Sequence, residues 1–186
     1  MSDTAPVEGN PLWEFTLSVY RREGVSQACI GLQDRLGLDV NFLLLALYAG
    51  THGFPLEARQ WEQLEALAKP WRENVIHPLR RLRRWLKEQH SLPAHYVDPI
   101  RRAVLAQEIE SEGMQQRLMW ATSPVPSGAP SLPCAARNLA AYCGFSKVTA
   151  KAGDLDALVT LLLQASPART REEAQAALAA TGIGTH

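Results

Sequence analysis

The sequence predicts an all-α protein, and three features of the chain lead to that prediction. Apolar residues recur at the three- and four-residue spacing of a helix face. No useful stretch alternates as a strand does, and glycine and proline divide the chain into segments of helical length. We expect a bundle of about five to six helices over residues 12–121, a Pro-rich linker over 122–133 and a small helical C-terminal segment over 134–186. Residues 1–11 are expected to be disordered.

The first two predicted helices are marked by residues typical of helix ends. Asn10 suits an N-cap and Pro11 suits the first helical position, so a helix should begin there and end at Gly24. A second helix is expected from Ser26 to Leu36, with Gly37 as its stop. It would bury one apolar stripe, made of Val25, Cys29, Leu32 and Leu36.

The third predicted helix is the most apolar segment of the chain. Asp39 stands at its N-cap position, ahead of a run from Val40 to Ala49 that is apolar on every side. Such a helix belongs in the centre of a core. It is too short to cross a bilayer, which takes about 20 apolar residues.

Residues 56–89 form a long helical pattern that contains two prolines. Pro70 and Pro78 each remove a backbone donor, so the segment predicts either two helices or one kinked helix. Its second part is amphipathic and basic. The apolar face of this part consists of Trp71, Val75, Leu79, Leu82 and Leu86.

A further helix is expected from about Val97 to Trp120. Its acidic middle, formed by Glu108, Glu110 and Glu112, could complement the basic helix electrostatically. Its expected apolar contacts are Ile100, Val104, Ile109, Met114 and Leu118.

The C-terminal third begins with four prolines in the twelve residues 122–133, a composition typical of an extended, unpacked linker. Three shorter helical patterns follow, over residues 135–143, 155–165 and 171–180. These helices could form a small bundle of their own or dock one by one on the main core.

Composition and charge limit the classes of function. The 19 basic residues balance 19 acidic ones, so total charge gives no argument for general nucleic-acid binding, and only a local patch could support it. The three cysteines form no C-x-x-C pair, which is typical of reduced, buried thiols. The N-terminus resembles no secretory signal, and we expect a cytoplasmic protein without a membrane segment.

A polar set flanks the break between the second and third helices. It consists of Gln33, Asp34, Asp39 and Asn41. These side chains could line a polar pocket in which buried carboxylates have raised pKa values. The simpler interpretation is that Asp39 caps the third helix and that Asp34 faces solvent or pairs with an arginine of the basic helix. Without histidine, the set suits only a weak site for a hard cation, and no metal site is predicted.

The basic helix supplies a second candidate surface, a face for an anionic partner. It consists of Arg72, Arg80, Arg83, Arg84 and Lys87, with Trp85 beside them as a possible stacking residue. The alternative is a solvated face, or one paired internally with Glu108, Glu110 and Glu112.

The chain matches no catalytic or cofactor motif with a known mechanism. It has no Walker A sequence, no Rossmann glycine fingerprint and no G-x-S-x-G, and its histidines lack ligand spacing. Cys29 lies on an apolar stripe, where a thiol is expected to be inert. We therefore predict no catalytic residue, cofactor or metal.

Three segments resemble an uncharacterised family of small helical proteins from gamma-proteobacteria, a domain of unknown function. They are L-W-E-F-T-L-S-V-Y from Leu12, A-C-I-G-L-Q-D-R-L-G-L-D-V-N-F-L-L-L from Ala28 and W-R-E-N-V-I-H-P-L-R-R-L-R-R-W-L-K from Trp71. Two positions depart from the family's pattern, Glu23 where proline is expected and Tyr48 where tryptophan is expected. The resemblance implies a bacterial protein and brings no reaction with it.

These observations favour a non-enzymatic cytoplasmic adaptor or regulatory protein that binds another macromolecule. The contact would use the basic helix or the C-terminal helices, with a protein as the expected partner and RNA or the ribosome as a further option. The alternative is a small enzyme or ligand-binding bundle whose pocket is formed by Gln33, Asp34, Asp39 and Asn41. The oligomeric state is left open.

Overall fold

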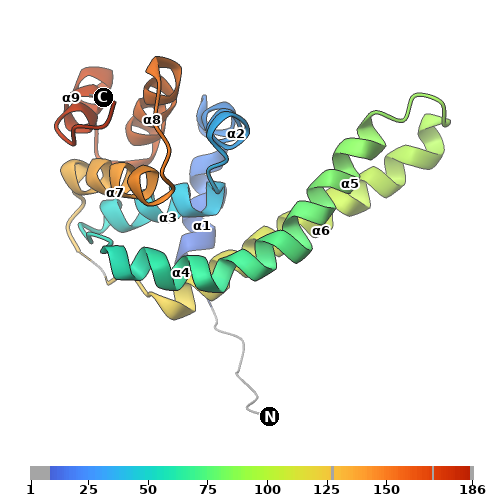
Figure 1. Ribbon diagram of the computed structural model, residues 1–186, viewed down its shortest axis with the longest axis horizontal. Coiled ribbons are helices and arrows are strands. Elements are labelled where there is room, and N and C mark those ends of the chain that lie inside the picture. The colour runs from blue at the N-terminus through green and yellow to red at the C-terminus, as the bar shows by residue number, and fades with distance from the viewer. Residues whose placement is uncertain (1–8, 127, 169, 185–186) are drawn as a thin grey trace, which may run out of the picture.

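The computed structural model describes residues 9–126, 128–168 and 170–184, and the regular structure within them is helical throughout (Figure 1). This confirms the all-α class. The elements are α1 (Pro11–Tyr20), α2 (Val25–Leu36), α3 (Val40–Thr51), α4 (Ala58–Trp71), the π-helical segment η1 (Arg72–Ile76), α5 (His77–Lys87), α6 (Ala94–Thr122), α7 (Leu132–Phe145), α8 (Ala152–Ala165) and α9 (Arg171–Ala179). The predicted disordered N-terminus falls mostly on residues 1–8, outside the described ones, and Pro11 is already helical.

Three predicted end signals act as expected in the first three helices, whereas α1 ends at Tyr20, before the predicted Gly24, which instead precedes α2 as its N-cap. The Asn10 side chain accepts a hydrogen bond from the Trp13 backbone N–H at 3.3 Å, which caps α1. Gly37 ends α2 in the left-handed conformation, with φ of 69°, which favours glycine. Asp39 Oδ1 caps α3 by accepting the Asn41 N–H at 2.8 Å. Local sequence therefore determines these boundaries.

Helix α3 is the centre of the core, as its composition predicted. Every residue from Asn41 to Gly50 is buried, and α7 lies across the helix. At Gly50 the two backbones come very close, because a Cβ added there would lie 2.2 Å from the Ala135 Cα. The crossing of α3 and α7 thus depends on a residue without a side chain.

The C-terminal helices dock on this core instead of forming a bundle of their own. Buried residues of α7, α8 and α9, such as Leu139, Leu161 and Leu178, belong to one hydrophobic cluster with those of α1 to α4. The described residues between α6 and α7 are non-helical, as expected, but several of them are packed. Val125 is buried, and the Ser131 N–H donates to the Gly50 carbonyl at 3.2 Å. The division into separate domains remains a prediction.

Helices α4 and α5 form one continuous rod through η1. The His77 N–H bonds to the Arg72 carbonyl, five residues back, which is the π-helical pattern. This extra residue in the turn lies between Pro70 and Pro78, where proline removes donors. The Asn74 side chain donates to the Pro70 carbonyl at 2.8 Å and satisfies that acceptor. Of the two predicted arrangements, the single helix is the one observed.

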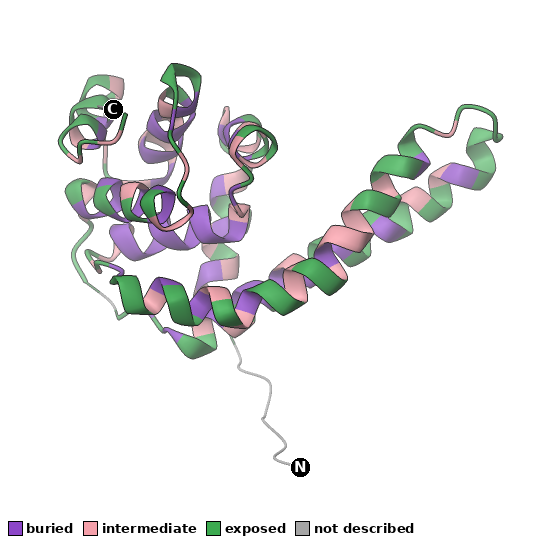
Figure 2. Ribbon diagram, viewed as in Figure 1, coloured by how far each residue is buried: buried purple, intermediate pink, exposed green. Residues whose placement is uncertain are grey.

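Helix α5 and the part of α6 beside it form an antiparallel hairpin that extends away from the core (Figure 1). We call residues 77–114 the arm. Three predicted apolar contacts of α6 are wrong, because Ile100, Ile109 and Met114 are 54%, 45% and 42% exposed. The arm has only two helices, so each buries one face, and the outer faces stay open (Figure 2). No helix in the described ranges combines the length and apolar character needed to cross a bilayer.

Candidate functional site

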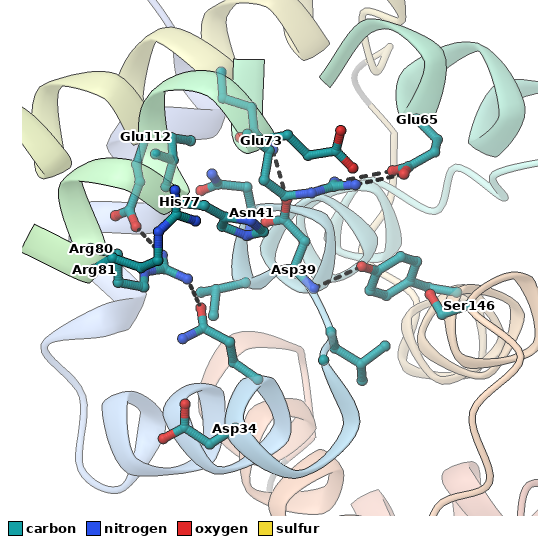
Figure 3. A pocket seen from close by; sticks show the side chains of 18 of the residues that line it. Asp34, Asp39, Asn41, Glu65, Glu73, His77, Arg80, Arg81, Glu112 and Ser146 are labelled. Carbon is teal, nitrogen blue, oxygen red and sulfur yellow. Dashed lines mark hydrogen bonds and ion pairs between the residues drawn. The ribbon is translucent and has the colours of Figure 1, made fainter. Parts of the chain in front are cut away.

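Both residue sets singled out from the sequence meet in one cleft at the base of the arm, with a volume of about 770 Å³ (Figure 3). All four members of the polar set, Gln33, Asp34, Asp39 and Asn41, line it. Arg72, Arg80 and Arg84 of the basic face also line it, whereas Arg83 and Lys87 do not. The polar set and the basic face thus form, for the most part, opposite walls of one cleft.

The walls of the cleft come from segments far apart in the chain. The end of α2, the turn after Gly37 and the first turn of α3 form one side, and η1 and α5 form the other. Helix α6 contributes Glu112 and Gln115, and the end of α7 contributes Tyr142. Asp34 lies toward one end of the cleft and Glu65 toward the other, with Asp39 between them (Figure 3).

Asp39 connects three of these segments. While Oδ1 caps α3, Oδ2 accepts hydrogen bonds from Arg72 Nη1 at 3.1 Å and Gln115 Nε2 at 2.9 Å. The Asp39 backbone N–H donates to the Tyr142 hydroxyl at 2.9 Å. Arg72 also bonds through both terminal nitrogens to the Glu65 carboxylate. Asp39 therefore does more than cap a helix, because it also holds α6 and η1 against the α2–α3 turn.

The arginines of α5 are mostly paired with carboxylates of α6 and α2. Arg80 donates to Glu108 at 3.1 Å, to Glu112 at 2.7 Å and to the Gln33 amide oxygen at 2.6 Å. Arg83 bonds to the same Glu108 carboxylate, whose side chain is nearly buried. The expected complementarity of the basic and acidic helices is confirmed for Glu108 and Glu112.

Asp34 and Asn41 have different roles. Asp34 pairs with Arg84 at 3.1 Å on the surface, as expected for a residue opposite the apolar stripe. The Asn41 side chain is buried and accepts a hydrogen bond from Gln116 at 2.8 Å, and Gln116 in turn accepts one from Thr16 at 2.9 Å. This chain of polar groups ties α1, α3 and α6 together.

The pKa values of the two carboxylates that face Arg80 are shifted in opposite directions. Burial raises the pKa of Glu112, and its contact with Arg80 only partly offsets that effect. Burial also acts on Glu108, but hydrogen bonds from Arg83 and Arg80 outweigh it and lower the pKa. Burial, together with Arg80 and Arg72, lowers the pKa of His77. His77 is thus kept neutral beside the cleft arginines.

One polar group that lines the cleft is unsatisfied. Gln115 is 0% exposed, and although its Nε2 donates to Asp39, its Oε1 has no hydrogen-bond partner. A buried acceptor without a donor is unfavourable, so Gln115 is a strained element of the cleft wall. The sequence interpretation missed Gln115, His77 and Arg81. A signal for Gln115 existed, since it shares the inward face of α6 with Val104, Ser111 and Met119.

The described residues hold no group of three or more histidine, cysteine, aspartate or glutamate side chains arranged for a metal ion. Burial raises the pKa of the Cys29 thiol to about 12, which leaves it protonated and unreactive at neutral pH. The cleft therefore offers ion pairs and amides, which are groups suited to binding.

The exposed apolar side chains gather on the arm. Among the described residues, every large apolar side chain classed as exposed lies between Leu82 and Met114, except Leu17 and Ile30. Trp85 is 53% exposed on α5, one turn from Leu82. The arm's own core is small and consists of Leu86, Val97 and Val104, with Leu79 packed against it.

Comparison with curated proteins and with solved structures finds no match. A protein family described as "Protein of unknown function (DUF2390)" matches residues 11–119, which include α1 to α5, most of α6 and most of the cleft. This agrees with the resemblance seen in the sequence, and it leaves the reaction or partner open. The chain belongs to the DUF2390 family.

Proposed function

We propose that this protein is a non-enzymatic cytoplasmic adaptor that binds a partner protein through the arm. The observation that carries the proposal is the concentration of exposed apolar side chains on the arm. Clustered apolar groups on a surface are typical of interaction sites. Tryptophan in particular supplies much of the binding energy at such interfaces.

The contact surface we propose is one flank of the arm. Leu82 and Trp85 lie on the side of α5 away from Arg80 and Arg84, by helical periodicity. Ile100 and Met114 of α6 project on the corresponding side, two full heptads apart. A face of two packed helices that carries exposed apolar residues from both is suited to a third amphipathic helix from a partner.

The basic face is less suited to a nucleic-acid partner than the sequence indicated. Arg80, Arg83 and Arg84 are paired with carboxylates, and within α5 only Arg81 and Lys87 have no ion pair. A phosphate would have to replace existing partners at the other positions. Contact with RNA or the ribosome is therefore an outcome to be tested.

The test is affinity purification of the tagged protein from its native cell at low salt, with and without nuclease. We expect a stoichiometric, nuclease-resistant partner that is lost with the double substitution Leu82→Glu and Trp85→Ala. Ile30→Glu is the matched control, because Ile30 is an exposed apolar residue of α2 that lies off the arm. Equal recovery with both variants would contradict the arm interface, and loss of the partner on nuclease treatment would indicate RNA or ribosomes.

A second candidate function is supported by the polar lining of the cleft, which includes Gln115. A volume of about 770 Å³ is within the range of small-molecule sites, and the lining is polar. In this case a polar ligand with a hydrogen-bond donor would bind in the cleft and raise the melting temperature by mass action. Screening polar metabolites by thermal melting tests this candidate. A true ligand should lose its effect with Gln115→Leu, which removes the amide at similar volume and frees Asp39 of one donor, and keep it with Lys87→Ala outside the cleft.

A further inference from the structure

The outer face of α6, which points away from α5, carries a stripe of residues with an internal symmetry. Ala106 lies at its centre, with Arg102 four residues before and Glu110 four residues after. Ala103 and Ile109 lie three residues before and after Ala106. All five are exposed, and their spacing places them on one side of the helix. This face differs from the flank proposed for the partner protein.

The two charges on this stripe have no partner within the described residues. Neither Arg102 nor Glu110 takes part in an ion pair, although Arg101 pairs with Asp98 and Glu108 pairs with two arginines. Eight residues of helix separate Arg102 from Glu110 by about 12 Å, so they do not pair with each other. Their signs are opposite, and they are equally far from Ala106. This is the charge pattern expected for pairing with an antiparallel copy.

The centre of the stripe allows a close approach of a second helix. Ala103 and Ala106 have only a methyl group, so two helix axes could come within about 8 Å. Ile109 is a large apolar residue whose symmetric counterpart is the small Ala103, so a large side chain would meet a small one. The stripe stops at Gly113, where Trp13 of α1 packs against the helix and a Cβ would lie 3.3 Å from its ring. The free surface is therefore limited to the arm.

We propose that a second copy of this chain covers the stripe, with the two α6 helices running in opposite directions and crossing at a twofold axis at Ala106, so that each helix diverges from the Trp13 that packs at Gly113 of the other copy. In this arrangement Arg102 of each copy lies level with Glu110 of the other, which gives two equivalent ion pairs. Ile109 of each copy fills the space above Ala103 of the other. The interface is isologous, as most dimer interfaces are.

The experiment is sedimentation equilibrium of the full chain over a range of protein concentrations. The wild type should show a monomer–dimer equilibrium that weakens with added salt. Arg102→Glu and Glu110→Arg should each weaken the dimer by about tenfold or more, because each places like charges together at both symmetric positions. The double variant should restore dimerisation, because both ion pairs re-form with reversed sense.

Lys87→Glu is the matched control, since it reverses an exposed, unpaired charge of the arm on the other helix. It should leave the dimer unchanged. Circular dichroism of every variant checks that the fold is intact, which we expect because the substituted residues are exposed. A monomer at all concentrations, or a dimer in which the double variant is no tighter than the single ones, overturns the proposal. A mixed complex that forms only with a different protein on this stripe also overturns it.

Discussion

The Asp39 carboxylate and the Arg72 guanidinium lie 3.1 Å apart, and both side chains are largely buried. This ion pair connects the first turn of α3 to the π-helical segment. Capping alone would make Asp39→Ala cost about 1 kcal/mol. The structure predicts more, about 3 kcal/mol, because the substitution also leaves Arg72 and Gln115 without an acceptor.

Asp39→Asn separates the effect of helix capping from the effect of the ion pair with Arg72. Asparagine caps helices about as well as aspartate, so only the charge and one acceptor change. Urea unfolding should place its loss of stability between the wild type and Asp39→Ala. Equal losses of stability for Asp39→Asn and Asp39→Ala would mean that the charge carries the whole effect. A loss of about 1 kcal/mol for Asp39→Ala would mean that Asp39 stabilises the fold by capping alone.

Glu108 and Glu112 should give stability profiles of opposite slope against pH. The folded state lowers the pKa of Glu108, so its contribution is present above the unfolded pKa and is lost as pH falls through the lower folded value. The pKa of Glu112 is raised, so its contribution is present below the unfolded pKa and is lost as pH rises through the higher folded value.

The isosteric substitutions Glu108→Gln and Glu112→Gln should therefore change the stability of the fold differently at neutral pH. Glu108→Gln should destabilise the fold by about 3 kcal/mol, because Arg80 and Arg83 both lose a charged partner. Glu112→Gln should be neutral or stabilising, because it removes a carboxylate that burial disfavours. Urea unfolding at pH 4 and pH 7 measures both, and a large loss for Glu112→Gln at pH 7 would contradict the assignment.

Gly50→Ala should be one of the most damaging small substitutions in the chain. The new methyl group would lie 2.2 Å from the Ala135 Cα, so α3 and α7 would have to separate. We expect a loss of about 3 kcal/mol or more, measured by thermal and urea unfolding. Gly144→Ala in α7 is the control, since no atom lies within 4 Å of its added Cβ. The free energy of unfolding of Gly144→Ala should rise by about 0.5 kcal/mol, because alanine has a higher helix propensity than glycine.

Amide hydrogen exchange should divide the molecule into two parts. The outer arm has a small core of Leu86, Val97 and Val104, so its amides should exchange through local opening. Amides of the buried helix α3, such as that of Leu44, should exchange only through global unfolding. Similar protection at Val97 and Leu44 in dilute protein would contradict this division.

The local features of this fold could be predicted, because the residues that cause them are neighbours in the chain. Asn10, Gly37 and Asp39 act within one helical turn, and each ends or begins a helix as expected. The pairing of α5 with Glu108 followed from complementary charge patterns. The meeting of α2, η1 and α6 around one cleft depends on tertiary packing, and no local pattern contains it.

The errors have an equally physical cause. Periodicity indicates which face of a helix is apolar, but it does not indicate how much of the helix length another element covers. Periodicity therefore predicts Ile100 and Ile109 as apolar contacts of α6, although both are exposed on the arm. The spacing of Gln115 from Val104, Ser111 and Met119 places it on the inward face of α6, but only its surroundings show that it lines the cleft.

The rod formed by α4, η1 and α5 has one end in the core and the other in the arm. Trp61, Leu64 and Ala68 anchor its first half, and no loop separates that half from the arm. Because the chain stays helical from Ala58 to Lys87, a displacement of the arm relative to the core would have to bend the helix near residues 72–76, where Arg72 bonds to Asp39. Such a displacement would change the shape of the cleft, because Arg72 and Ile76 of this segment line it.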